Sequence, residues 1–155
     1  MGTLLLGGVA GVIGTAAMSA LLVIARTAGF MESTPPRRIT ERIARQSGTD
    51  RVLSGPAFEA SWVAAHVGYG AVCGALYALA SGRPPASPVP AGLVFGGLVW
   101  AGSYLGILPA LGIYDGPDGE ESPATTATMV SAHAVYGVAT ALARERIREP
   151  EALFG

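Results

Sequence analysis

The feature that most constrains this chain is a long apolar run near its start. No charged residue occurs from Thr3 to Ala25, and Arg26 is the first charge after the run. About 20 apolar residues in an α-helix are enough to cross the hydrocarbon core of a bilayer. The run lacks the basic beginning and the short apolar centre of an ordinary signal peptide. We therefore expect a membrane-spanning helix over about residues 3–25 that is retained in the protein.

Three further apolar segments predict three more spans, over about residues 58–80, 89–113 and 123–143. The last is the weakest, since it is rich in threonine and alanine. Near the start of each segment a serine is followed by a proline, which is typical of a helix start because the first turn does not need proline's missing N–H. The expected fold is all-α: a polytopic membrane protein built as a four-transmembrane-helix bundle, with residues 1–155 forming a single membrane domain.

The composition supports this fold class and argues against others. Half of the residues are hydrophobic and 14% are charged, against roughly a quarter charged in a typical soluble domain. No basic stripe with interleaved aromatic residues occurs, so nucleic-acid binding is not expected. Glycine accounts for 22 residues, and small residues four apart favour close helix contacts in lipid. Such small-xxx-small pairs occur at Gly7/Gly11, Gly70/Gly74, Gly92/Gly96 and Gly102/Gly106.

The segment between the first two spans contains a second kind of helix signal. Residues 33–36 read Ser-Thr-Pro-Pro, and Ile39 and Ile43 then fall on one helical face among arginines. This pattern predicts a short amphipathic helix over about residues 36–46. Such a helix either lies at the membrane surface with its apolar face in lipid or belongs to a solvated loop.

The pattern A-H-x-x-Y-G occurs twice, at residues 65–70 and 132–137. It places His66 and Tyr69 on the second span, and His133 and Tyr136 on the fourth. A duplicated two-helix hairpin explains this internal repeat. In such a duplication the second and fourth spans run parallel, so the two histidines should lie at similar depth near the middle of the membrane.

Polar side chains extend the repeat along helical faces. Glu59, His66 and Tyr69 share one stripe of the second span, and the third span contributes Tyr104. Unpaired polar groups in hydrocarbon cost several kcal/mol, so these faces should point into the bundle. The candidate intramembrane polar site consists of Glu59, His66, Tyr69, Tyr104, His133 and Tyr136.

The two histidines allow three interpretations. They fix the register of the bundle through hydrogen bonds; or His66 and His133 bind a b-type haem from opposite faces; or they form a proton or solute path with the tyrosines, with Glu59 near its mouth. No HExxH, GxSxG or phosphate-loop motif is present, and no metal-site spacing is recognisable. We therefore assign no catalytic residue and no metal site, and an enzyme is not the favoured reading.

Several short motifs together carry a family resemblance. They are T-A-A-M-S at 15–19, P-P-R-R-I-T at 35–40, the run His66–Tyr69–Gly70–Gly74–Tyr77, the run Trp100–Ser103–Tyr104–Leu105–Gly106–Pro109, and His133–Tyr136–Gly137. With these motifs the chain resembles a group of small bacterial inner-membrane proteins of unknown function, broadly YagU-like. The resemblance implies a prokaryotic four-helix membrane protein, and it supplies no reaction, substrate or site residue.

The favoured function at this stage is a non-enzymatic component of the bacterial inner (plasma) membrane. Such an accessory or interaction subunit would contact the lipid bilayer and pack through its glycine faces as a homo-oligomer or against a larger membrane complex. Two alternatives remain open: a haem-bearing electron-transfer protein that uses His66 and His133, and a small channel or transporter with an intramembrane His/Tyr relay.

Overall fold

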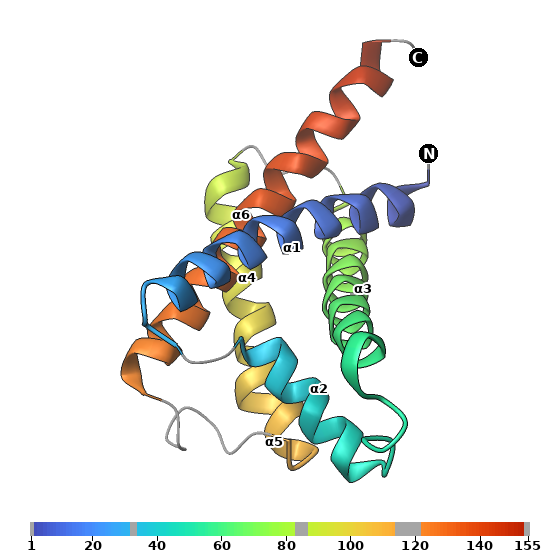
Figure 1. The fold of residues 1–155 in the computed structure, drawn as a ribbon. Helices are drawn as coiled ribbons and strands as arrows, with labels where there is room; N and C mark the ends of the chain where they lie inside the picture. Colours follow the sequence, from blue (N-terminus) through green and yellow to red (C-terminus); the bar gives the residue numbers. More distant parts are fainter. Residues whose placement is uncertain (1, 32–33, 83–86, 114–121, 154–155) are drawn as a thin grey trace.

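The computed structural model describes residues 2–31, 34–82, 87–113 and 122–153, with backbone alone for 148–153. The regular structure of these residues is entirely helical, which confirms the all-α expectation (Figure 1). The elements are α1 (Thr3–Thr27), α2 (Pro35–Gln46), α3 (Gly55–Ser81), α4 (Pro88–Ala101), the π-helical turn η1 (Gly102–Ile107), α5 (Leu108–Ala110) and α6 (Pro123–Leu153).

Three helical stretches of the described chain are long and apolar enough to cross a membrane. They are Thr3–Thr27, Gly55–Ser81 and Pro88–Ala110, the last formed by α4, η1 and α5 in succession. Large apolar side chains on all three are exposed, as expected where lipid rather than water surrounds a helix; examples are Leu5, Val72, Leu76, Leu98 and Leu105. The chain is therefore a helical membrane protein. Helix α6 is not among the three stretches. Threonine, serine and histidine lower the hydropathy of its uncharged part, residues 123–143.

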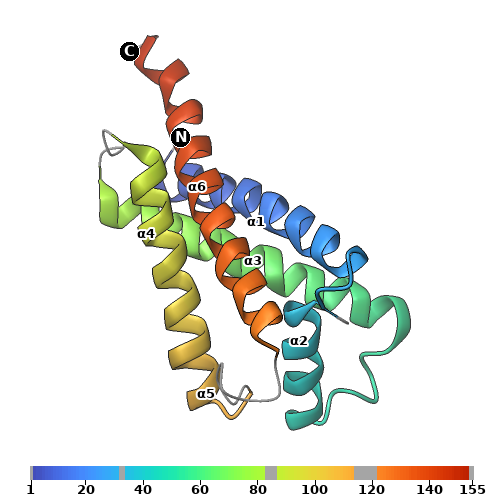
Figure 2. The same ribbon diagram turned by 90° about the vertical axis from the view of Figure 1, so that its left-hand side faces the viewer.

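Helices α1 and α6 cross at the centre of the molecule, while α3 and α4 flank them. Helix α1 packs against α3 and α6, and α4 packs against α6. Helices α3 and α4 are not closely packed against each other. The start of α1 and the end of α6 lie toward one end of the molecule, and α2 and α5 lie toward the other (Figures 1 and 2). The backbones of α3 and α4 are therefore farther apart than those of the other neighbouring helices, and side chains connect them, as where the rings of Tyr77 and Phe95 stack with 4.5 Å between centroids.

Glycines set the closest helix contacts. On α1, Gly11 lies directly against the backbone of Gly70 on α3. On α4, Gly92 faces Gly137 and Val138 of α6, and a Cβ built on Gly92 would lie 2.6 Å from the Cα of Val138. That separation is below van der Waals contact, so these backbones approach each other only because no side chain intervenes.

The third apolar stretch widens into the π-helical turn η1 just before Pro109. Proline's ring crowds the carbonyl group four residues earlier, here that of Leu105, and its missing N–H removes one hydrogen bond. A wider turn is one way for a helix to accommodate this disruption, and π-helical turns are frequent at functional sites. The stretch ends at Ala110, one residue after Pro109. The turn contains two buried polar residues, Ser103 and Tyr104.

A buried arginine fastens α6 to the end of α3. Arg144 is 2% exposed. Its guanidinium donates hydrogen bonds to the carbonyl oxygens of Ala78 at 3.1 Å and Gly82 at 2.9 Å, and to Oγ of Ser81 at 2.6 Å. The last carbonyl groups of a helix have no partner within it and form the negative end of its dipole. Arg144 therefore donates hydrogen bonds to carbonyl groups at the C-terminus of α3 and places a positive charge beside the negative end of the helix dipole.

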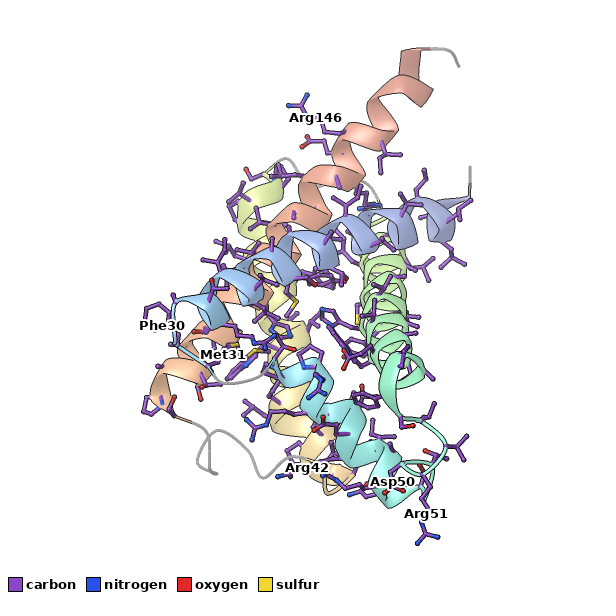
Figure 3. The ribbon with its side chains drawn as sticks, in the orientation of Figure 1. Phe30, Met31, Arg42, Asp50, Arg51 and Arg146 are labelled. Carbon is purple, nitrogen blue, oxygen red and sulfur yellow. The ribbon has the colours of Figure 1, made fainter. Side chains whose placement is uncertain are left out.

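Helix α2 is tied to two other parts of the molecule. Near its start, Nε of Arg37 lies 3.3 Å from Oε1 of Glu59 on α3. Further along, Nη1 of Arg42 donates a 2.9 Å hydrogen bond to the carbonyl oxygen of Ile113, just beyond α5 (Figure 3). The helix thus connects α3 to the end of the third apolar stretch.

Candidate ligand-binding cavity

A cavity of about 320 Å³ lies between α3, η1 and α6, with α1 behind it and α2 across one side. Its wall is mostly apolar, with a small number of polar side chains, which is the usual construction of small-molecule sites. The polar side chains on the wall are those of Thr15, Thr40, His66, Tyr69, Ser103, Tyr104, His133 and Tyr136. Five of the six residues of the candidate polar site therefore line one cavity.

The amphipathic helix α2 contributes its apolar face to this cavity. Pro36, Ile39 and Ile43 of α2 all line it. The sequence left open a helix on the membrane surface and a solvated loop helix. The structure adds a third role, in which α2 covers a cavity inside the protein.

His66 of α3 presents an unsatisfied nitrogen. Its Nε2 atom is buried and has no hydrogen-bond partner among the residues that the structure describes. A buried polar atom without a partner costs about 1–3 kcal/mol. Such atoms are uncommon in folded proteins, so each one requires an explanation.

His133 of α6 is oriented by its own backbone. Its Nδ1 atom lies 2.8 Å from the carbonyl oxygen of Met129. Because a carbonyl oxygen can only accept, Nδ1 must carry the hydrogen, and Nε2 is the ring nitrogen left for a ligand. The ring of Tyr104 meets the imidazole edge-on, with 5.8 Å between ring centroids. This contact connects η1 to α6 at the cavity wall.

The two tyrosines of the repeated motif are engaged with protein groups. The Tyr136 hydroxyl donates to the carbonyl oxygen of Gly70 at 2.7 Å, and this bond is buried. The hydroxyls of Tyr69 and Ser103 share a 2.8 Å hydrogen bond, which joins α3 to η1. Tyr69 is nevertheless 46% exposed. It therefore stands at the side of the cavity where α3 and α4 are not closely packed.

Glu59 does not line the cavity. Its Oε2 atom accepts a 2.6 Å hydrogen bond from Nε1 of Trp62, and its Oε1 atom faces Arg37 of α2. Glu59 therefore belongs to the attachment of α2, and no acidic side chain occurs among the described residues of the cavity wall.

Comparison with known proteins gives one match. Residues 1–153 match a family described as a family of unknown function (DUF6789). The chain belongs to this family. No curated protein and no solved structure matches the chain. Family membership assigns no activity, and the YagU-like resemblance stays a prediction. Any function for this member of the family must therefore be argued from its own cavity.

The residues of the cavity do not fit a haem. A dry apolar cavity of about 150 Å³ accepts a benzene molecule, so the 320 Å³ here suits one substituted ring rather than a macrocycle of four. Its described wall contains no arginine to pair with propionates, and the hydrogen bond between Tyr69 and Ser103 closes one side. The described residues also contain no cluster of three or more histidine, cysteine, aspartate or glutamate side chains that could hold a metal ion.

Proposed function

We propose that this protein spans a bacterial inner membrane four times, with α6 as the fourth span. The position of α6 supports this reading, because it packs along both α1 and α4 inside the bundle. We also propose that the pairs α1/α3 and α4/α6 are duplicated hairpins. In support, Gly70 and Gly137 each follow a motif histidine by four residues, and each lies against a glycine of its partner helix.

We propose that the protein binds a small lipid-soluble ligand in its cavity. The observation that carries this proposal is the buried, unpartnered Nε2 atom of His66, which belongs to a side chain of the mostly apolar cavity wall. A ligand that forms a hydrogen bond with Nε2 removes the cost of leaving that atom unsatisfied. Its apolar part would fill the remaining volume beneath α2.

Ligand binding would specify the non-enzymatic role that the sequence predicts. A binding subunit of a homo-oligomer or of a larger membrane complex would hold its ligand beneath α2, while its exposed apolar perimeter faces lipid or a partner. The small-channel alternative has less support, because ion paths are built from rings of carbonyl or charged groups. The described wall of this cavity contains no aspartate, glutamate, lysine or arginine side chain.

Native mass spectrometry of the protein released from mild detergent tests the proposal. We expect a bound small molecule that is absent from Ala65→Phe, since Ala65 lines the cavity and a benzyl group there would take the space of one aromatic ring. Ala64→Phe is the matched control, because Ala64 is an exposed neighbour on the same helix that does not line the cavity. Retention of the same bound mass by Ala65→Phe would contradict the proposal.

A further inference from the structure

We propose that the ligand is a phenol or hydroquinone dissolved in the bilayer, which donates a hydrogen bond from its hydroxyl to Nε2 of His133. This inference rests on the proposed ligand-binding function and names the chemical class that the cavity selects. It follows from the direction of the hydrogen bonds already made on the cavity wall and from the shape and lining of the space.

The direction of the hydrogen bond follows from His133. Its Nδ1–H is used by the carbonyl oxygen of Met129. No acidic side chain occurs on the described wall to balance a charged imidazolium, and an unpaired charge in apolar surroundings is expensive. The ring is therefore neutral, and its Nε2 atom is an acceptor. An acceptor requires a donor, so a carbonyl compound such as a quinone cannot satisfy it.

His66 strengthens the case for a hydroxyl group. A neutral imidazole donates from one nitrogen and accepts at the other, and the buried Nε2 atom of His66 has either role according to its tautomer. The oxygen of a hydroxyl group that donates its hydrogen to His133 still accepts, so it satisfies the tautomer of His66 that carries its hydrogen on Nε2. The second hydroxyl of a hydroquinone supplies a donor for the other tautomer. The other hydroxyls of the wall are less available, since Tyr136, Tyr69 and Thr15 each hold a hydrogen bond to a protein group.

The remaining wall suits an aromatic ring. Met18 and Met129 line the cavity and are almost fully buried, and thioether sulfur makes favourable contacts with aromatic rings. The ring of Tyr104 packs edge-on against His133 and adds an aromatic side chain to the cavity wall. The volume of about 320 Å³ is about twice that of a cavity that holds benzene. One ring with several small substituents fits these limits.

The bilayer is the source of this ligand because the cavity approaches the membrane-facing side of the bundle. Helices α3 and α4 are not closely packed together, and Tyr69 stands between α3 and η1 with 46% of its surface exposed. A ligand that enters on this side must pass the hydrogen bond between Tyr69 and Ser103. On another side, Pro36, Ile39 and Ile43 of α2 line the cavity.

The test compares two probes of nearly equal size on the full chain in lipid nanodiscs. One is a trimethylphenol, and the other is the tetramethylbenzene in which a methyl group replaces the hydroxyl. Binding is measured by equilibrium dialysis and corrected for partition into protein-free nanodiscs. One hydrogen bond to a buried acceptor predicts about tenfold tighter binding of the phenol. We expect His133→Phe to remove that preference while tetramethylbenzene still binds, and Ala64→Phe to keep the preference.

The outcomes separate the two proposals. Equal binding of the two probes to the wild-type protein would overturn the phenol class and leave the ligand-binding cavity standing. Binding of neither probe above lipid partition would overturn the phenol class together with the ligand-binding function. A preference for the phenol that survives in His133→Phe would place the selecting acceptor elsewhere and overturn the role given to His133.

Discussion

The hydroxyl of Tyr136 donates a 2.7 Å hydrogen bond to the backbone carbonyl oxygen of Gly70, and the bond is buried. The two residues come from the two copies of the A-H-x-x-Y-G pattern, so the tyrosine of one copy bonds to the glycine of the other. This contact joins α6 to α3 beside the cavity. Tyr136→Phe keeps the ring and removes the bond, so we expect it to lower the free energy of unfolding by about 1 kcal/mol. Thermal unfolding in detergent measures the change.

Tyr77 provides the control for this substitution. It lies on α3, and its buried hydroxyl has no hydrogen-bond partner among the described residues. Removing an unsatisfied hydroxyl relieves a cost, so Tyr77→Phe should leave the stability unchanged or raise it. If both variants lost the same stability, the bond between Tyr136 and Gly70 would not be the cause.

Close packing at glycine predicts a second pair of variants. A Cβ at Gly92 would meet the backbone of Val138 at 2.6 Å, whereas a Cβ at Gly97 would meet nothing within 4 Å. We expect Gly92→Ala to destabilise the protein by about 1–3 kcal/mol, because two backbones must separate. Gly97→Ala should be neutral or slightly stabilising, because alanine favours a helix interior. Circular dichroism during thermal unfolding distinguishes the two, and equal stability of the variants would refute the packing argument.

The attachment of α6 to α3 through Arg144 can be tested by removing its charge and donors. Arg144→Met leaves the carbonyl groups of Ala78 and Gly82 without these bonds, and we expect a loss of at least about 2 kcal/mol in the free energy of unfolding. Arg51 is an exposed arginine elsewhere in the molecule (Figure 3). Arg51→Met should change stability by less than about 0.5 kcal/mol. A similar loss in both variants would indicate a general charge effect.

The attachment of α2 predicts a local effect rather than a global one. Glu59→Gln weakens the ion pair with Arg37, which is substantially exposed and so contributes little to stability. Amide hydrogen exchange across Pro35–Gln46 should therefore accelerate by up to about fivefold, while exchange in α1 stays unchanged. Asp50→Asn at the same end of the molecule is the charge-matched control. Unaltered exchange in α2 would show that this pair does not hold the helix.

Much of the candidate site could be predicted from the sequence. Helical spacing and the repeated motif predicted that His66, Tyr69, His133 and Tyr136 face the same interior, and all four line the cavity. Tyr104 joins them because η1 places it there. Glu59 was grouped with them through its stripe on α3, but Trp62 and Arg37 hold its carboxylate away from the cavity. Periodicity defines a helix face, and it does not define how far along that face a cavity extends.

Other features depend on contacts between distant segments and could not be read from local pattern. Arg144 directly follows the last predicted span, over about residues 123–143. It is buried because its partners lie at the end of α3, more than sixty residues earlier. The apolar face of α2 was visible in Ile39 and Ile43, but nothing local showed that it would cover a cavity rather than lipid. The chemistry of His133 likewise depended on the backbone geometry of its own helix turn.

Photo-crosslinking in liposomes tests the central claim most directly. The probe is a small phenol that carries a diazirine, and the crosslinked peptides are identified by mass spectrometry. We predict labelling at residues 65–70 of α3 and 129–136 of α6, competed by excess trimethylphenol, lost in Ala65→Phe and kept in Ala64→Phe. Labelling confined to outward residues such as Leu93 and Leu98, and unchanged in Ala65→Phe, would contradict the existence of a ligand-binding cavity.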